Sequence, residues 1–416
     1  MAVFRLRSLE YASETSFALN AENPSANTWD QKIPAENIVL TLGHERMPDL
    51  ASQDRANNRG LSHLGVRTGT LEFDTNICGH FTDPSSGSLT ERWPVTLLGY
   101  ALGGKRTAGA GSTIIGSATS TTSVLYLASA AGWVAGDMLA HGSKGDARGD
   151  GQVLVASGIT GGSGKIDLLT EAVGSSGSTT DTISRMALIY HDETAALTTT
   201  RWSGMSSDTG AQFHMMGCQL ADLRWTIPLD GSSGLPKWHW TYNVAYWARQ
   251  ATTFPSALTL QDDFAAPCAG GSFFLANVGT KTRTTKTPAT IQLELEMGLV
   301  PTVGPGGAGT YQVITAWSRP TVSPALTIQI PWETARETAF DIANQSYTYE
   351  HGLLTANPTG GRRWAFYMPR MFYEGNRPNQ VENVNDLNYL TARWRGTEGT
   401  DTATALTRSA IRFGFG

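Results

Sequence analysis

The chain has 416 residues, of which only 16 % are charged, and its formal net charge is −5. The low charge content and the 45 glycines favour β-sheets joined by turns over helical bundles. The acidic balance disfavours a stoichiometric nucleic-acid binder, because such proteins normally present a basic face. No run of about 18 apolar residues is present, so we expect no membrane insertion and folding in a reducing cytoplasm.

The first 36 residues are interpreted as an N-terminal arm. Asn20–Ser25 and Lys32–Pro34 contain prolines and show no amphipathic period, which is typical of extended or turn-like chain. Strand signal begins at Ile38. The polar stretch Gly43–Leu64 is too long for a tight hairpin, and loops of this length are usually functional. We therefore expect a contact surface there. Its charged residues include Arg46, Asp49, Asp54, Arg55 and Arg59.

A strand with one polar face and a short helix follow this loop. In Thr68–Asn76, Leu71 and Phe73 fall on one face, while Glu72 and Asp74 fall on the other. The segment Pro94–Leu102 is predicted to be helical, because it has proline near its start and two glycines after its end.

Residues 105–190 differ in composition from the flanking sequence. They are dense in Gly, Ser and Thr, and short apolar segments alternate with Gly-rich turns. This spacing predicts a small β-barrel or sandwich. We interpret it as an inserted β module that interrupts a domain formed by 37–104 and 191–250.

The clearest hairpin signal lies directly after this module. Residues 221–227 and 238–246 each alternate large apolar with polar residues, and the turn Asp230–Gly234 separates them. One face of both strands must be buried, since a row of exposed aromatic residues would promote aggregation.

The same succession of strands is repeated in residues 251–416. The strands at Ile38 and Leu71 correspond in spacing to those at Ile291 and Leu326, and a second helix is predicted at Glu333–Ala343. The aromatic strands that end the first copy correspond to those around Trp364 and Leu390 in the second. The sequence therefore predicts a mainly β protein with two tandem sandwich or barrel units, each with a short helix, plus the inserted module.

Motifs of catalysis are not found. HExxH and GxSxG are absent, and the three cysteines Cys78, Cys218 and Cys268 lack the spacing of a zinc site, so we expect buried thiols. Glu294 and Glu296 share a strand face, but no opposing acid is identifiable for glycoside hydrolysis. We expect no enzyme, no catalytic residue, no cofactor and no metal.

The order of these elements resembles that of the tail tube (major tail) proteins of long, non-contractile-tailed bacteriophages. The shared features are an arm, a β unit with a short helix, a long charged loop, an insertion, and a second unit with the strand Tyr367–Arg370. The resemblance covers roughly residues 30–416. It implies a structural virion protein, made in the bacterial cytoplasm, whose stacked rings form the tail tube and conduct DNA.

The resemblance also assigns roles to residues. Arg46, Asp49, Asp54, Arg55 and Arg59 become candidates for contacts between rings. Glu72, Asp74, Glu294 and Glu296 become candidates for lining the lumen, where acidic side chains would avoid tight phosphate contacts.

The implied partners are further copies of the chain and other tail proteins. Rings of this family have six tube domains, so two domains per chain imply three chains per ring, with the inserted module projecting outward. Tail terminator, tape measure and distal tail proteins are the other expected partners, and DNA passes transiently. The alternative is a β-rich capsid decoration or receptor-binding protein.

Overall fold

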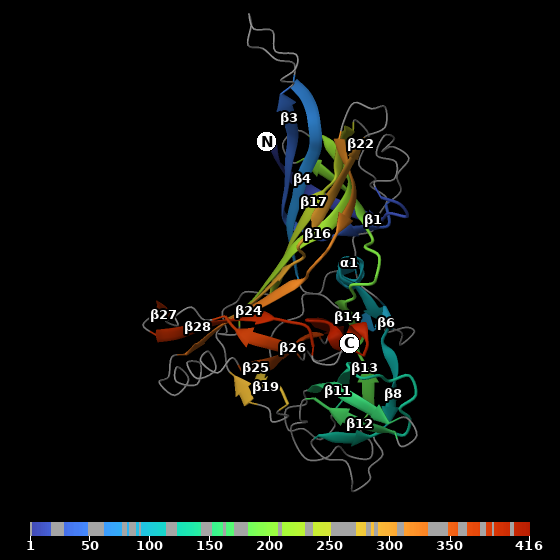
Figure 1. The fold of residues 1–416 in the computed structure, drawn as a ribbon, viewed down its shortest axis with the longest axis vertical. Coiled ribbons are helices and arrows are strands. Elements are labelled where there is room, and N and C mark those ends of the chain that lie inside the picture. The colour runs from blue at the N-terminus through green and yellow to red at the C-terminus, as the bar shows by residue number, and fades with distance from the viewer. Residues whose placement is uncertain are drawn as a thin grey trace, which may run out of the picture.

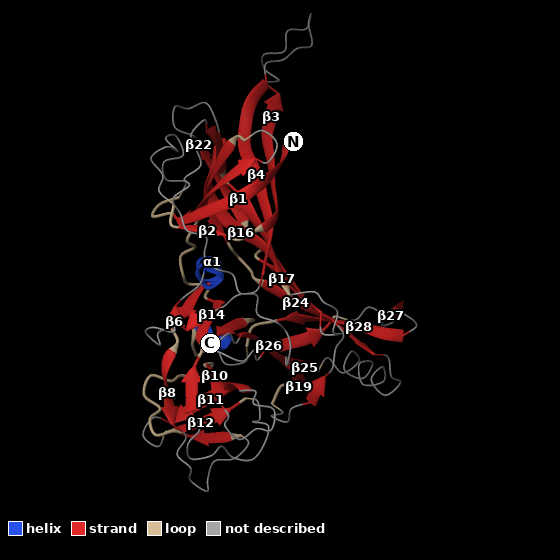
Figure 2. Ribbon diagram, turned by 180° about the vertical axis from the view of Figure 1, so that it is seen from behind, coloured by secondary structure: helices blue, strands red, loops and turns tan. Residues whose placement is uncertain are grey.

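The computed structural model shows a mainly β protein (Figures 1 and 2). It describes residues 2–17, 29–48, 62–76, 81–82, 89–90, 93–113, 123–142, 152–160, 164–169, 182–206, 210–228, 236–250, 272–279, 284–286, 290–305, 312–331, 348–356, 364–374, 380–384, 387–399 and 403–416. The long strands form an upper arm, while the inserted region lies at the opposite end of the molecule (Figure 1).

A first set of four long strands pairs antiparallel in the order β3, β4, β17 and β16. Their bounds are Glu36–Pro48 for β3, Ser62–Asn76 for β4, Lys237–Val244 for β17 and Gln212–Pro228 for β16. Alternating apolar residues put the side chains of Phe73, Trp240 and Leu223 into the core from three neighbouring strands.

Two further strands close this set into a barrel. β1 (Ala2–Ser13) pairs with β3 through its first residues and with β15 (Thr200–Ser206) through the rest. β15 pairs in turn with the first half of β16. Gly217 in β16 has a φ of 59°, and β16 passes there from the β15 side to the β17 side of the barrel. Residues 2–13 thus belong to the barrel, which corrects their interpretation as part of an arm.

The second set of strands shows the same pairing order. β21 (Thr290–Glu296), β24 (Ser323–Pro331) and β28 (Leu387–Gly396) are neighbours in that order. β28 then pairs with β26 (Trp364–Tyr373) and, nearer its start, with β27 (Gln380–Val384).

The two sets join edge to edge. The second half of β16 pairs with β21 from Asp222↔Glu296 to Pro228↔Thr290. Eight strands, from β3 through β16 and β21 to β27, consequently form one continuous antiparallel sheet.

A further sheet backs the second set. Its strand order is β7, β14, β29, β26, β25 and β19. The bounds are Gly103–Arg106 for β7, Ala187–His191 for β14, Arg412–Phe415 for β29, Tyr349–Ala356 for β25 and Ser272–Asn277 for β19. Short strands β2 (Gln31–Ile33), β18 (Tyr246–Gln250) and β20 (Thr284–Lys286) pair with β1, β16 and β19, respectively.

The inserted region forms a six-stranded antiparallel sheet with its own core. The strand order is β8 (Gly109–Thr113), β13 (Thr182–Arg185), β10 (Met138–Gly142), β11 (Gln152–Thr160), β12 (Lys165–Leu168) and β9 (Val124–Tyr126). Strand β11 pairs with β10 through Gln152–Val155 and with β12 through Ala156–Thr160, so it joins two groups of strands that share one apolar core.

The inserted sheet also packs against the sheet that backs the second strand set. Met138 and Val153 share an apolar cluster with Phe274 and Leu353 of β19 and β25. Asp137 is fully buried, and it accepts a hydrogen bond of 2.6 Å from Arg106 Nε. The module is thus braced against the rest of the chain.

The helix α1 (Trp93–Leu102) confirms the prediction for Pro94–Leu102. Its last carbonyls, those of Ala101 and Leu102, accept hydrogen bonds from Arg319, which follows β23 (Gln312–Ser318). A second short helix, α3 (Ala405–Arg408), lies near the C-terminus. The helix predicted at Glu333–Ala343 lies outside the described residues.

One apolar core runs beneath both strand sets. At their junction Trp225 of β16 lies 4.6 Å from Trp364 of β26 and 5.6 Å from Trp238 of β17, between ring centroids. Cys218 is buried as predicted, and burial raises the pKa of its thiol well above the usual value. Cys78 and Cys268 lie outside the described residues.

Candidate functional site: a polar sheet face and its edges

One face of the eight-stranded sheet carries many polar and charged side chains from β4 to β28. Because directly paired residues of antiparallel strands point to the same side, the registers define transverse rows. Glu72 faces Thr241, which is followed by Asp222 and then Glu296. In the next row Asp74, His239, Arg224 and Glu294 succeed one another.

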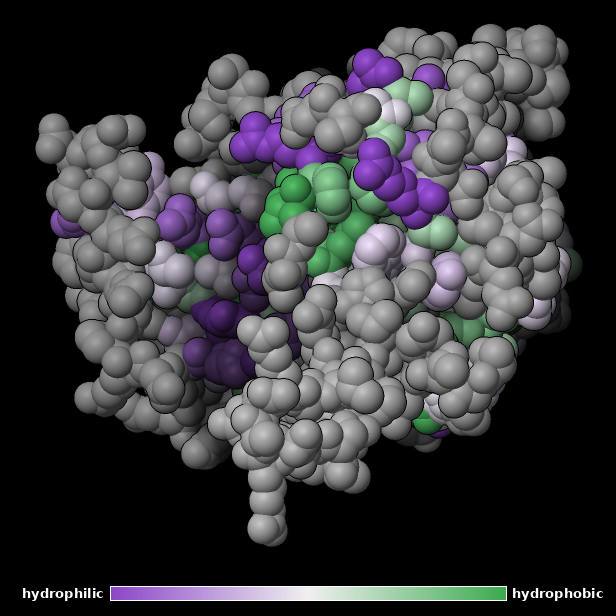
Figure 3. Space-filling model, turned by 90° about the horizontal axis from the view of Figure 1, so that it is seen from above, coloured by the Kyte–Doolittle hydropathy of each residue, from purple (hydrophilic) through white to green (hydrophobic). Residues whose placement is uncertain are grey.

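The four acids predicted to share a surface therefore lie on a common face. Glu72 and Asp74 belong to β4, while Glu294 and Glu296 belong to β21, more than 200 residues later. The junction of β16 with β21 brings them together. Figure 3 shows a band of hydrophilic residues beside a smaller hydrophobic patch when the molecule is viewed along its long axis.

Basic side chains partly neutralise this face. His239 Nδ1 lies 2.6 Å from Asp74 Oδ1, and Arg393 Nη2 lies 3.0 Å from Glu294 Oε2. Arg224 Nε lies 2.8 Å from Asp222 Oδ2. The face thus carries mixed charge, whereas only its acids were predicted from the sequence. Long-range attraction for a polyanion is weak on such a surface.

Asp222 occupies the most acidic point of the face. Burial raises the pKa of its carboxyl, Arg224 lowers it, and the nearby Glu294 and Glu296 raise it further. Directly opposed like charges destabilise a strand pair, yet Asp222 is paired with Glu296 across the junction of the two sets. The junction is therefore held by its backbone bonds and its Trp-rich underside.

The predicted contact loop is a long hairpin in this structure. β3 continues to Pro48 and β4 begins at Ser62, so strands replace much of the loop expected at Gly43–Leu64. Arg46 lies within β3, opposite Leu64. Asp49, Asp54, Arg55 and Arg59 lie outside the described residues.

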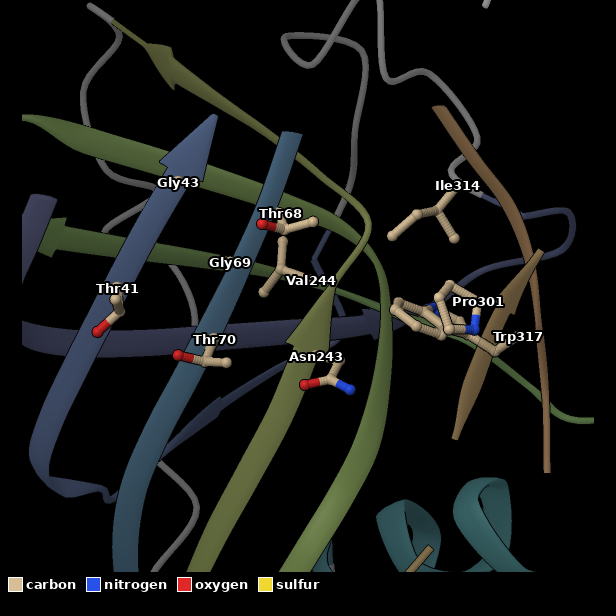
Figure 4. A pocket seen from close by; sticks show the side chains of 10 residues that line it. All are labelled: Thr41, Gly43, Thr68, Gly69, Thr70, Asn243, Val244, Pro301, Ile314 and Trp317. Atoms are coloured by element: carbon tan, nitrogen blue, oxygen red, sulfur yellow. The ribbon is translucent and has the colours of Figure 1, made fainter. Parts of the chain in front are cut away.

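The second set also carries a hairpin, which was not predicted from the sequence. β22 (Val300–Pro305) pairs with β23 as a separate hairpin. Trp317 Nε1 of this hairpin donates to the Gly217 carbonyl at 2.7 Å. Between the hairpin and the ends of β3, β4 and β17 lies a cavity of about 280 Å³ (Figure 4). Its lining residues are Thr41, Gly43, Thr68, Gly69, Thr70, Asn243, Val244, Pro301, Ile314 and Trp317.

Two sheet edges complete the site. At one edge, among the described strands, β27 pairs with β28 alone. At the other edge Ala2–Arg5 of β1 is the one described segment that runs beside β3. These edges were not predicted, because pairings between distant strands leave no local signal in the sequence.

The described residues contain no cluster of three or more His, Cys, Asp or Glu side chains that could hold a metal ion. None of the described helices is long and apolar enough to cross a membrane. Comparison with protein-family models and with curated proteins gives no match.

Proposed function

We propose that this protein is a structural subunit of a tube, and specifically the tail tube protein of a bacteriophage with a long, non-contractile tail. Copies of the chain would form rings that stack into a tail tube, and the lumen of the tube would conduct DNA into the host. The observation that carries this proposal is the edge-to-edge junction of two strand sets with the same pairing order.

The two sets support an interpretation as tandem tube domains. Leu40, Leu71 and Tyr242 form a row across β3, β4 and β17. Leu293, Leu326 and Trp394 form a similar row across β21, β24 and β28. β16 follows the first row, and β26 with β27 follows the second. A chain that joins two equivalent units at one pair of edges has the complementary pair of edges left for its neighbours.

Such a contact is heterologous and closes into a ring if the rotation between units is right. Three chains of two units each would give a ring with true three-fold and approximate six-fold symmetry. Their inner sheets would contain about 24 strands, and at roughly 4.8 Å per strand the circumference would be about 115 Å before strand tilt widens it.

The polar face is the one that suits a lumen. Its opposite face is filled by the Trp-rich core, so only the polar face is available to solvent. Mixed charge on Glu72, Asp74, Arg224 and Glu294 would let DNA pass without lasting phosphate contacts. The long β3–β4 hairpin and Arg46 within it would then reach the next ring.

In this proposal the other partners are tail terminator, tape measure and distal tail proteins, and the site of action is the virion tail after assembly in the host cytoplasm. No catalytic step is assigned to the chain. The inserted sheet would lie on the outside of the tube, since it is braced against the sheet that backs the second set.

Electron microscopy of the purified chain tests the proposal. At high concentration we expect hollow tubes with a regular axial repeat, and at low concentration single subunits or rings. Dispersed globules after long incubation at high concentration would contradict the proposal and would favour a capsid decoration or receptor-binding protein.

A further inference from the structure

The strands β3 and β21 occupy the same place in their sets, but different strands cover their outer edges. Leu40 of β3 faces Leu71, and Leu293 of β21 faces Leu326, so Leu40 and Leu293 are equivalent. Beside Leu293 lies Trp225 of β16. Beside Leu40 lies Phe4 of β1.

The first residues of β1 therefore hold the position that β16 holds in the second set. Ala2–Arg5 pairs antiparallel with Val39–Leu42, whereas β16 pairs with the whole of β21, Thr290–Glu296. Four residue pairs stand in place of seven. A short edge strand is one of the devices by which proteins protect a sheet edge from unwanted pairing.

Two apolar side chains of this segment, Val3 and Phe4, are only partly covered. The Phe4 ring lies 4.6 Å from the Phe213 ring and is only half-buried. Val3 faces the same side as Thr41, on the polar face, and is 65 % exposed. The equivalent position next to β21 carries Arg224. An exposed valine on a polar face buries little apolar surface, which favours displacement of this end of β1.

The opposite end of the sheet offers the matching strand. Trp225 of β16 faces Trp238 of β17, and Val381 of β27 faces Leu390 of β28. Trp238 and Leu390 are equivalent, because each lies four residues before the aromatic residue of its row, Tyr242 or Trp394. In backbone register Val381 thus corresponds to Trp225, and no described strand pairs with the outer edge of β27.

We propose that Ala2–Arg5 is a removable cap on the β3 edge, and that β27 of a second copy of this chain replaces it. The internal junction sets the register between copies, with Gln380 opposite Thr41, Val381 opposite Leu40 and Glu382 opposite Val39. This inference rests on the proposed function, because it specifies the contact that closes the ring.

The exchange has a physical rationale. A free β3 edge and a free β27 edge on one soluble chain would pair indiscriminately, whereas a cap delays pairing until a correctly placed partner competes for the edge. Replacing the cap gives β27 a partner while β3 stays paired, and the five residues of β27 can form more pairs with β3 than the four residues of the cap. Residues Leu6–Ser13 keep β1 in the barrel through β15, which lets the cap leave without unfolding the barrel.

A reversible lock tests the cap. Facing positions of antiparallel strands bring Cβ atoms to about 4.5–5.5 Å, so Val3→Cys combined with Thr41→Cys allows a disulfide between β1 and β3. Under oxidising conditions we expect this variant to remain as single subunits, and after reduction to form tubes like the unmodified chain. The single variants Val3→Cys and Thr41→Cys, oxidised in parallel, are the controls and should assemble. Tubes formed by the oxidised double variant, with its disulfide intact, would overturn the proposal.

A second pair of substitutions tests the register. Thr41→Cys combined with Gln380→Cys should give disulfides between copies in assembled tubes and none in dilute single subunits. The matched control, Thr41→Cys with Asn383→Cys, is out of register by three residues and should cross-link far less. Equal cross-linking of both pairs would overturn the register.

The outcomes separate this inference from the proposed function. If the unmodified chain forms no tubes, the function itself fails. If it forms tubes but the lock has no effect, only the cap is wrong. Deletion of residues 2–5 adds a kinetic measurement: we expect a lag before tube formation that is several-fold shorter than that of the full chain, and an unchanged or longer lag would count against the cap.

Discussion

The two strand sets share a pairing order but differ in what completes them. The first set closes into a barrel, because β1 and β15 bridge β3 to the bent strand β16. The second set stays open along β27 and is backed by a sheet that includes β14 and β7, the strands that flank the insertion.

This difference between the two sets indicates that the pairing order and the closure of a sheet have separate causes. Alternating apolar residues in Leu71–Thr75 and Ile291–Leu295 determine which face is buried, and hence the register in each set. Closure depends on which further strand pairs with the outer edge of each set. Residues 2–5 of β1 pair with β3 in the first set, whereas β16 of the first set pairs with β21 in the second.

The largest expected effect comes from removing the shared core of the two sets. Trp225 is 1 % exposed and contacts Trp364, Trp238 and Phe366 from both sides of the junction. Trp225→Ala should lower the free energy of unfolding by about 3–5 kcal/mol, as measured by denaturant titration. Trp133→Ala, in the separate core of the inserted sheet, is the matched control. If both variants destabilise the same unfolding transition, the two cores do not unfold separately.

A second variant tests the brace between the inserted sheet and the rest of the chain. Asp137 accepts hydrogen bonds from Arg106 Nε at 2.6 Å and from the Val134 amide at 2.9 Å. Asp137→Ala leaves both donors without this acceptor and should cost about 3 kcal/mol. Hydrogen exchange should show faster exchange in β10 and β11, with β3 and β4 unchanged. Lys165→Ala, which removes a partly exposed pair with Asp167, is the control and should change little.

A third variant tests the barrel through its pH dependence. Glu10 of β1 is fully buried, and neither of its oxygens has a hydrogen-bond partner among the described residues. Burial raises the pKa of its carboxyl to about 7, against a weaker opposing effect of Lys32. Because the folded pKa lies above the unfolded one, ionisation of Glu10 destabilises the fold progressively from about pH 4.5 to pH 7.

Glu10→Gln should therefore raise stability at pH 8 by on the order of 2–3 kcal/mol and should change it little at pH 4. Thermal unfolding across this pH range measures the effect. Glu36→Gln, at an exposed position in β3, is the control for the same chemical change at the surface of the barrel. A stabilisation of equal size at both pH values would mean that Glu10 does not titrate in this range.

Charge reversal on the polar face should have the smallest effect on stability but a clear effect on DNA binding. Glu72→Lys combined with Glu296→Lys places two cations in one row, and surface changes of this kind usually alter stability by less than about 0.5 kcal/mol. Assembled tubes should then retain DNA in a salt-dependent way. Glu193→Lys with Glu398→Lys makes the same charge change away from this face. Equal DNA binding by both variants would argue that the face does not line the lumen.

The sequence predicted the elements whose period is regular. Ile291–Met297 alternates without interruption, and α1 has clear start and stop residues, so both were predicted correctly. β1 was missed because its register shifts between Leu6 and Leu9, which breaks the period of two. β22 was missed because its two prolines and a glycine are typical of loops.

The candidate site was predicted only in its parts. Alternation placed Glu72 and Asp74 on one face of a strand, and likewise Glu294 and Glu296. It gave no information on which edges meet, so Asp222, Arg224 and His239, which lie between the two acidic pairs, were not identified as members of the same surface. Pairing of distant strands depends on packing of the whole chain and has no local signature.

The number of chains in the smallest ring decides whether one chain supplies two of the six units of a ring. Native mass spectrometry or cryo-electron microscopy of isolated rings should find three copies of the 44.6-kDa chain, with three-fold symmetry and an approximate six-fold inner sheet. Six copies per ring, or assemblies without a central channel, would contradict the account.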